Sequence, residues 1–228
     1  MHLNHMEHRT VAVRRHRGVS LVEMLVGITV GLFVVVGAAK LLVDYLINSR
    51  QVLLETRVNQ DLRVAADVVV RDLRRAGYWS NSLSGATWPA ATNPFRGVTP
   101  TGVNVATTAT YSYESGAIAG FRLGSATVSG QPVGVIEAHV GGVTWQQLTD
   151  PTSVNITQFD VTPNIQTVSL GTYCTPVCAL GSPGCPTINV RRYDVVISGT
   201  AVSDSRVQRQ LRERVRVRND EIPTPSCP

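Results

Sequence analysis

One uninterrupted apolar run, residues 19–39, constrains this chain more than any other part of its sequence. As a helix that rises about 1.5 Å per residue, the run is about 30 Å long, which is enough to cross a lipid bilayer. It holds one charged residue, Glu23. A carboxylate in the apolar interior of a membrane costs about 2.5–3.5 kcal/mol, so Glu23 needs a physical reason to be there.

Charge before the run predicts its orientation. Arg9, Arg14, Arg15 and Arg17 precede it against one acidic residue, Glu7, and supply most of the formal net charge of +5. Basic residues hold the adjacent end of a membrane span in the cytoplasm, so we expect everything after residue 40 on the other side of the membrane. Because the rest of the chain is close to neutral, its high isoelectric point does not indicate nucleic-acid binding.

The helical pattern continues beyond the run to residue 76, and no proline occurs before Pro89. Gly77 then follows as a typical helix C-terminal residue, with Arg74 and Arg75 placed to interact with the helix dipole. We therefore predict one helix over about residues 20–76, apolar in its first half and amphipathic in its second. Apolar residues at spacings of three and four form one stripe on the second half: Leu54, Val58, Leu62, Ala65, Val69, Leu73 and Ala76.

The composition changes after Gly77. Residues 78–132 are rich in Thr, Ser, Gly, Ala and Asn, which predicts a long surface connection with short strands. These features indicate an α+β fold in which the helix stripe packs on an antiparallel β-sheet head. Strands are predicted over residues 109–114, 118–123, 133–140, 154–161, 188–198 and 206–218.

The last predicted strand has one apolar face and one basic face. Its arginine face, with Arg212, Arg214, Arg216 and Arg218, is compatible with an anionic partner such as DNA or phospholipid. A solvated edge-strand face that uses charge against aggregation is the favoured alternative. No aromatic residues interleave the arginines as a single-strand binding surface requires, so direct nucleic-acid binding is not expected.

All the cysteines lie in the last quarter of the chain: Cys174, Cys178, Cys185 and Cys227. In an exported domain an even number of cysteines indicates disulfides. The alternative is a zinc site, but the C-x3-C spacing is followed by gaps of six and forty-one residues, without the paired C-x2-C knuckles usual for zinc. We therefore expect disulfides and no metal. Three connectivities are possible, and pairing Cys227 with the 174–185 cluster would tie the C-terminal tail to a Pro/Gly-rich loop.

Candidate catalytic residues are scarce. All histidines except His139 lie before the apolar run, and His139 has no Ser or Asp at a recognisable motif spacing. Gly141-Gly142 does not match a phosphate-binding loop. We expect neither a catalytic site nor a cofactor.

Two interpretations of the apolar run use only general export signals. A secretory signal peptide would be cleaved after the small residues 36–38, but its apolar core is usually about 7–15 residues long and lacks a carboxylate. An uncleaved signal anchor would place Glu23 about 6–8 Å inside residue 18, close enough to reach the lipid headgroups.

A third interpretation accounts for Glu23. Residues 17–26, Arg-Gly-Val-Ser-Leu-Val-Glu-Met-Leu-Val, resemble the class III signal of type IV prepilins. The resemblance implies that a dedicated peptidase cuts between Gly18 and Val19, and that the new amine of Val19 is methylated, although the family usually has Phe or Met there. Glu23, the fifth mature residue, would then pair with the N-terminal amine of a neighbouring subunit, which makes a buried carboxylate tolerable.

The resemblance continues beyond the signal. Residues 67–79, Asp-Val-Val-Val-Arg-Asp-Leu-Arg-Arg-Ala-Gly-Tyr-Trp, are similar to the stretch that closes the long helix of PilW-type minor pilins. Residues 95–98 and 215–219 are weaker matches to the same type. Ser80-Asn81 stand where many relatives have a cysteine, so the disulfides of those relatives are not transferred to this chain.

The resemblance implies a type IV pilin-like organisation. Residues 1–18 would be a prepilin leader, 19–77 a long helix, and 78–228 a β-rich head with a disulfide-bearing C-terminal region. Within the helix, residues 19–40 would form the membrane span and later the filament core, and residues 41–77 would pack on the head.

The function implied is assembly and not catalysis. A PilW-type subunit primes type IV pilus assembly at the tip, and motility, adhesion and DNA uptake depend on it indirectly. Its partners would be other minor pilins, the major pilin, the prepilin peptidase, a large tip adhesin and, before assembly, inner-membrane lipid. The precursor would have a cytoplasmic N-terminus and a periplasmic head, and the mature subunit would reach the pilus at the cell surface.

Two alternatives stay open. A J-like minor pseudopilin of a type II secretion system shares the helix and head plan. A signal-anchored periplasmic binding domain or enzyme shares only the membrane segment.

Overall fold

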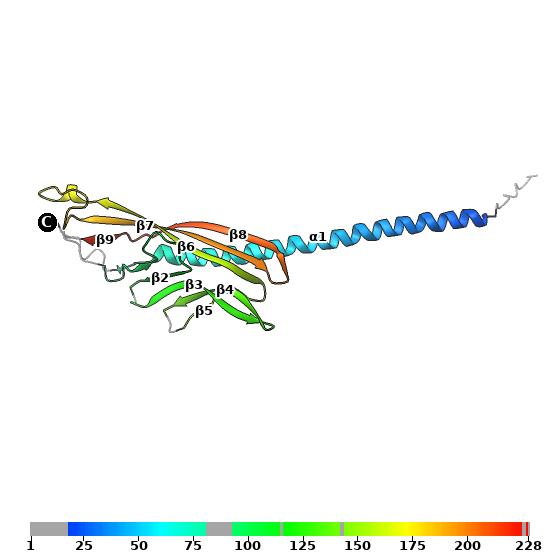
Figure 1. The fold of residues 1–228 in the computed structure, drawn as a ribbon, viewed down its shortest axis with the longest axis horizontal. Coiled ribbons are helices and arrows are strands. Elements are labelled where there is room, and N and C mark those ends of the chain that lie inside the picture. Colours follow the sequence, from blue (N-terminus) through cyan, green and yellow to red (C-terminus); the bar gives the residue numbers. More distant parts are fainter. Residues whose placement is uncertain (1–17, 81–92, 115, 142–143, 225–226, 228) are drawn as a thin grey trace, which may run out of the picture. The chain divides into compact units, whose positions relative to one another are not determined.

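The computed structural model describes residues 18–80, 93–114, 116–141, 144–224 and 227 of this chain. The chain divides into two compact units, Met1–Ser49 and Arg50–Pro228. One helix, α1 (Leu21–Arg75), begins in the first unit and ends in the second (Figure 1). The predicted helix is confirmed to within one residue at each end, as expected for a segment with no proline and a continuous apolar pattern.

The helix ends where the sequence predicts. Ala76 and Gly77 form the turn that follows Arg75, and Gly77 has a φ of +70°, a conformation that glycine adopts without a steric penalty. The Gly77 amide donates a hydrogen bond to the Ser112 carbonyl at 2.9 Å, which directs the chain from the helix to the first sheet.

The second unit contains two antiparallel sheets. The first has the order β1 (Val98–Thr99), β2 (Thr108–Ser112), β3 (Ile118–Val128), β4 (Gln131–Val140) and β5 (Gln146–Gln147). The second has the order β6 (Val154–Ser169), β7 (Thr187–Ala201) and β8 (Asp204–Arg216), and β9 (Glu221–Thr224) also pairs with β7. An isolated β-bridge joins Ala106, in the segment before β2, to Val161 of β6.

Each predicted strand overlaps an observed one, and β3 and β6 extend furthest beyond their predicted ends. β3 continues through residues 124–128, which the sequence predicts as part of the long connection, because all five of these residues pair with β4. β6 continues from residue 161 to Ser169 because residues 162–169 pair with β7. Pro163 is buried and Ile165 is half-buried, but the side chains of residues 166–168 are exposed, so the apolar alternation stops before the strand ends.

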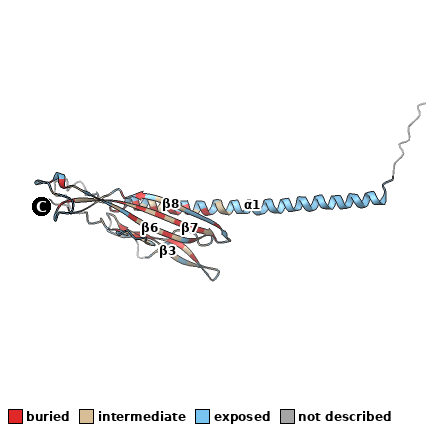
Figure 2. Ribbon diagram, turned by 45° about the horizontal axis from the view of Figure 1, so that its top comes forward, coloured by how far each residue is buried: buried red, intermediate tan, exposed pale blue. Residues whose placement is uncertain are grey.

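One core joins the second half of α1 to both sheets. Six of the seven predicted stripe residues are buried, and Leu54 is half-buried at the end of the stripe. Figure 2 shows this half of α1 carrying buried positions (red), as do β6, β7 and β8. Gly199 of β7 leaves room for α1 to pack on this sheet, since a Cβ there would lie 3.3 Å from Leu62 Cδ2 and 2.9 Å from Val154 Cγ2.

Leu62→Ala should lower the free energy of unfolding of the head by about 2–5 kcal/mol, because it leaves a cavity in a close-packed core. The matched control is Val64→Ala, since Val64 lies on the same helix and is 64% exposed. The control should change stability by less than about 0.5 kcal/mol. Urea unfolding of the full chain in detergent measures both, and equal losses would contradict the assigned helix face.

Candidate assembly site

The first unit presents an apolar helical surface. Every large apolar side chain from Val19 to Ile47 is more than half exposed. By length and composition, α1 is the only helix in the described part of the chain that can cross a membrane. A soluble protein rarely exposes so much contiguous apolar surface, which indicates contact with lipid or with other helices.

The predicted processing residues lie at the start of this unit. Gly18, Val19 and Ser20 precede α1 and are exposed, and Glu23 lies in the first helical turn. The Met24 amide donates to the Ser20 carbonyl at 3.1 Å, so regular helical bonding begins directly after the proposed cut. A carboxylate in the first turn interacts favourably with the helix dipole.

Polar contacts tie α1 to the head in the second unit. Tyr111 Oη donates to Asp72 Oδ2 at 3.2 Å, and the pKa of Tyr111 is raised above its ordinary value by burial first and by the Asp72 charge second. Asp61 accepts a hydrogen bond from Ser153, and Glu55 forms an ion pair with Arg209 of β8. Together with the apolar stripe, these three contacts fix the rotation of the helix on the sheets.

The C-terminal end of α1 is capped from distant parts of the chain. Asn219 Nδ2 donates to the Ala76 carbonyl at 3.1 Å, and the Arg218 amide donates to the Arg74 carbonyl at 3.1 Å. Asn93 Nδ2 donates to the Gly77 carbonyl at 2.7 Å. Helix-end carbonyls need partners of this kind, because the helix itself supplies none.

The three segments that carry the pilin resemblance beyond the signal meet at this helix end. Residues 67–79 close the helix, and residues 215–219 supply Asn219 and Arg218. Residues 95–98 lie beside them, since Ser112 Oγ donates to the Phe95 carbonyl and the buried Arg191 donates to the Arg96 carbonyl. The three segments therefore lie together at the capped end of α1. The helical pattern of residues 67–79 alone does not indicate this arrangement.

The cysteines form two disulfides. Cys174 is bonded to Cys227, and Cys178 to Cys185. All three possible connectivities tie the C-terminal tail to the loop after β6, and in the structure Cys174 makes this link. The tail also carries β9, so covalent and hydrogen-bonded links hold it against the same sheet.

The arginine face of β8 is partly neutralised by carboxylates of the same sheet. Arg214 pairs with Asp194 of β7, with a distance of 2.7 Å, and its hydrogen bond lowers the pKa of that carboxyl. Arg206 likewise lowers the pKa of Asp204 to about 2. These pairs support a solvated edge strand and leave less free positive charge than the sequence suggests.

His139 takes part in a packed cluster on the first sheet. Its Nδ1 lies 2.6 Å from the Ile118 carbonyl, and its ring contacts Trp145 edge-on at 5.4 Å between centroids. Arg122 stacks over the same Trp145 ring, with its Cζ 4.4 Å from the centroid, and pairs with Glu137. These packing and hydrogen-bonding contacts account for the position of the His139 side chain.

Comparison with protein families agrees with this arrangement. Residues 13–39 match the prokaryotic N-terminal methylation motif. Residues 51–217, well over half of the chain, match the family described as prepilin peptidase-dependent protein B. The chain belongs to this family. No curated protein and no solved structure matches it.

Membership establishes the general class of the protein. A prepilin peptidase-dependent protein with an N-terminal methylation motif is a type IV pilin-like structural subunit. The motif and the apolar first half of α1 indicate a membrane-anchored precursor, with the prepilin peptidase and other pilins as partners. The narrower PilW type is not confirmed by either match.

The two disulfides should differ in their contribution to stability. Cross-linking residues 53 apart, as Cys174–Cys227 does, stabilises by about 4 kcal/mol in the chain-entropy model. Residues 7 apart, as in Cys178–Cys185, give about 2 kcal/mol.

We therefore expect the Cys174→Ser/Cys227→Ser variant to lose more stability than the Cys178→Ser/Cys185→Ser variant. Urea unfolding of the oxidised full chain measures both losses, and each double variant serves as the control for the other. The reverse order would show that chain entropy does not dominate.

Proposed function

We propose that this protein is a minor pilin that acts as a structural subunit in the priming of type IV pilus assembly, at the pilus tip with other minor pilins. The observation that carries the proposal is the methylation motif at residues 13–39 joined directly to an apolar, exposed helical surface. A single subunit cannot bury that surface, so the membrane and then neighbouring subunits must cover it.

Processing would convert a membrane anchor into an assembly element. Cleavage between Gly18 and Val19 on the cytoplasmic side would leave the mature chain with the amine of Val19 at its end, and methylation would follow. The apolar half of α1 would then exchange lipid for the helices of neighbouring subunits. Both environments are apolar, so the exchange requires little net desolvation of the helix.

Glu23 would give this exchange its specificity. In an apolar filament core, an unpaired carboxylate is strongly disfavoured, whereas one paired with the N-terminal amine of a neighbour is tolerated. The proposed pairing therefore selects one axial position of the incoming subunit. The head would remain in the periplasm during assembly and then contact the major pilin, other minor pilins or a large tip adhesin.

A minor pseudopilin of the J type has the same helix and head plan, so gene deletion is the discriminating experiment. Loss of surface pili with intact protein secretion is the result expected for a minor pilin. Loss of exoprotein secretion with pili intact would overturn the proposal in favour of a type II secretion system.

The mature chain should begin at Val19, with a methylated amine. Intact-mass and N-terminal peptide mass spectrometry of the membrane fraction would measure this directly, with peptidase-deficient cells as the control that retains the leader. A mature chain beginning at Met1, or after Ala38, would contradict processing as a prepilin.

Glu23→Ala should leave cleavage intact and lower incorporation into pili by at least about tenfold, since removing one partner of a buried ion pair costs about 3–5 kcal/mol. Asp44→Ala is the matched control, because Asp44 is an exposed carboxylate on the same part of α1. Quantitative immunoblots of sheared pili and of membranes separate incorporation from processing. Normal incorporation of Glu23→Ala would remove the proposed amine-pairing role.

A further inference from the structure

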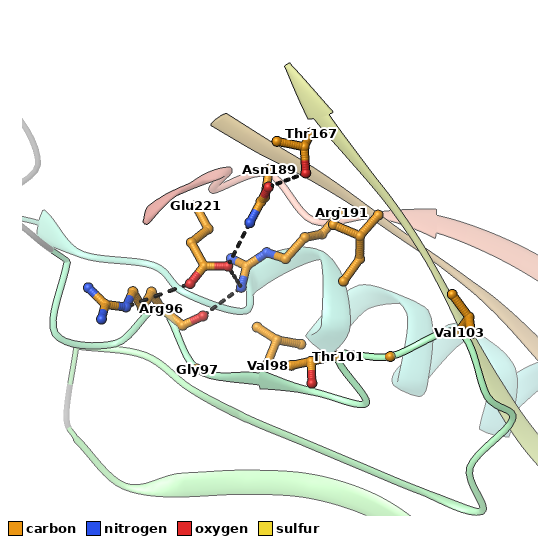
Figure 3. A pocket seen from close by; sticks show the side chains of 11 residues that line it. Arg96, Gly97, Val98, Thr101, Val103, Thr167, Asn189, Arg191 and Glu221 are labelled. Carbon is orange, nitrogen blue, oxygen red and sulfur yellow. Dashed lines mark hydrogen bonds and ion pairs between the residues drawn. The ribbon is translucent and has the colours of Figure 1, made fainter. Parts of the chain in front are cut away.

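Strand β8 forms one edge of the second sheet. It pairs with β7 along one side, and no described strand pairs with its other side. Beyond β8 the same side of β7 is taken by β9, where Figure 3 shows Glu221 joined to Asn189 and Arg191. An edge strand presents backbone N–H and C=O groups to which a further strand can add.

The hydrogen bonds at the end of β8 show which of its residues present these groups. In an antiparallel pair, alternate residues bond to the neighbouring strand and the others point away from it. The Val217 amide donates to the Arg191 carbonyl of β7 at 3.1 Å. The next amide, that of Arg218, donates instead to the Arg74 carbonyl of α1. By the continuous register with β7, the even-numbered residues from 208 to 216 therefore present their backbone groups outward.

The protein covers both ends of this row with its own groups. At one end the Gln208 carbonyl accepts a hydrogen bond from Arg209 Nη1 at 2.9 Å. At the other end α1 accepts the bond from Arg218. Between these ends no described residue bonds to the outward backbone groups, so water solvates them in the free protein. We call residues 210–216 the open edge, and its outward residues are all exposed: Gln210, Arg212, Arg214 and Arg216.

The outward side chains of the open edge are only partly neutralised. Arg214 pairs with Asp194 of β7 at 2.7 Å. Arg216 pairs with Asp220 at 2.9 Å. Arg212 forms no ion pair among the described residues. Arg212 is thus the position at which a further carboxylate meets a cation that is not already paired.

Arg192 of β7 adds to the positive charge. It lies directly opposite Arg216 in the register, and like charges in that arrangement repel each other. The open edge and its neighbour therefore hold four arginines beside two carboxylates, Asp194 and Asp220. The difference is an excess of two positive charges.

This charge determines which strand can add. A second copy of the chain that added its own β8 would bring arginines opposite arginines, which like-charge repulsion opposes. An acidic strand would place a carboxylate opposite Arg212 while its backbone bonds to the outward groups. In strand addition the main-chain bonds supply affinity, and the side chains supply specificity.

We propose that the open edge of β8 binds an extended acidic segment of a partner protein by antiparallel strand addition, with Arg212 as the residue that recognises its carboxylate. The proposal does not depend on the pilus function, because the open edge lies in the head and includes no part of α1.

The probe is the heptapeptide acetyl-Thr-Val-Glu-Val-Glu-Val-Thr-amide, titrated calorimetrically into the full chain in detergent. Added antiparallel, it places its two glutamates opposite Arg212 and Arg214. It should bind, and the same peptide with both glutamates replaced by glutamine should bind about fivefold more weakly, because two cross-strand charge pairs are lost. No binding of the glutamate peptide, or equal affinity of the two peptides, would overturn the proposal.

N-methylated peptides separate strand addition from simple charge attraction. In the proposed register the glutamate amides point toward β8, and the valine amides point away from it. N-methylation of both glutamates should therefore lower the affinity at least about tenfold, because it removes two donors to β8. N-methylation of the first two valines is the matched control and should cost much less. Equal losses would show that the peptide backbone does not pair with β8, contrary to the proposal.

One variant tests the recognition residue. Arg212→Gln should weaken binding of the glutamate peptide by about two- to fivefold, the effect of one cross-strand charge pair, and should leave the glutamine peptide unaffected. Arg206→Gln is the matched control, because Arg206 is an exposed arginine of the same strand outside the open edge. The same affinity for both variants would remove the role of Arg212 and overturn the proposal.

Amide hydrogen exchange, measured by NMR on the full chain in detergent, locates the bound strand. The amides of Arg212 and Arg214 should exchange fast in the free protein and slowly with the glutamate peptide bound, whereas the amide of Val215 should be protected in both states. Peptide binding without this protection would place the peptide elsewhere and contradict the proposal. Protection that is present without peptide and grows with protein concentration would show that a second copy occupies the edge, which would equally contradict it.

Discussion

Burial of one face of α1 against both sheets is the constraint on which the head depends. Val58, Leu62, Val69 and Leu73 belong to the same core as side chains from both sheets, so no layer of the head has a complete core without the helix. The same helix must also remain apolar on all sides in the first unit. Its sequence meets both demands by changing from a uniformly apolar composition to a single stripe, without a proline or glycine break at the change.

Much of this fold can be predicted from the sequence because it follows from repeating patterns. Spacings of three and four residues predict the buried face of α1, and the apolar face predicted by alternation in 206–218 includes Val215 and Val217, which are buried. The strands β1, β5 and β9 were missed because segments of two to four residues are too short to show alternation. The second half of β6 was missed because its strand character comes from pairing with β7 and not from its own side chains.

The prepilin signal, the disulfides and the buried Arg191 also differ in how far the sequence predicts them. The prepilin signal was recognised from a local motif, whereas the roles of Gly18, Val19 and Glu23 stay predictions. The disulfide connectivity depends on which distant cysteines the fold brings together, so counting cysteines could not determine it. Arg191 was missed although a signal existed, since it shares the inward parity of β7 with Tyr193, Val195 and Ile197. An arginine in that register should have been recognised as a buried cation in need of partners.

The cap supplied by Asn219 has a consequence for the order in which the protein is made. Asn219 and Ala76, which it caps, are 143 residues apart in sequence, and a ribosome adds residues from the N-terminus onward. The hydrogen bond from Asn219 to the Ala76 carbonyl at the end of α1 therefore cannot form until almost the entire head has been synthesised. Contacts of such long sequence separation form late in folding. A product truncated before residue 215 would thus lack the cap of α1 and the core residues Val215 and Val217. The head can therefore reach its complete folded structure only after the chain has been synthesised almost to its end.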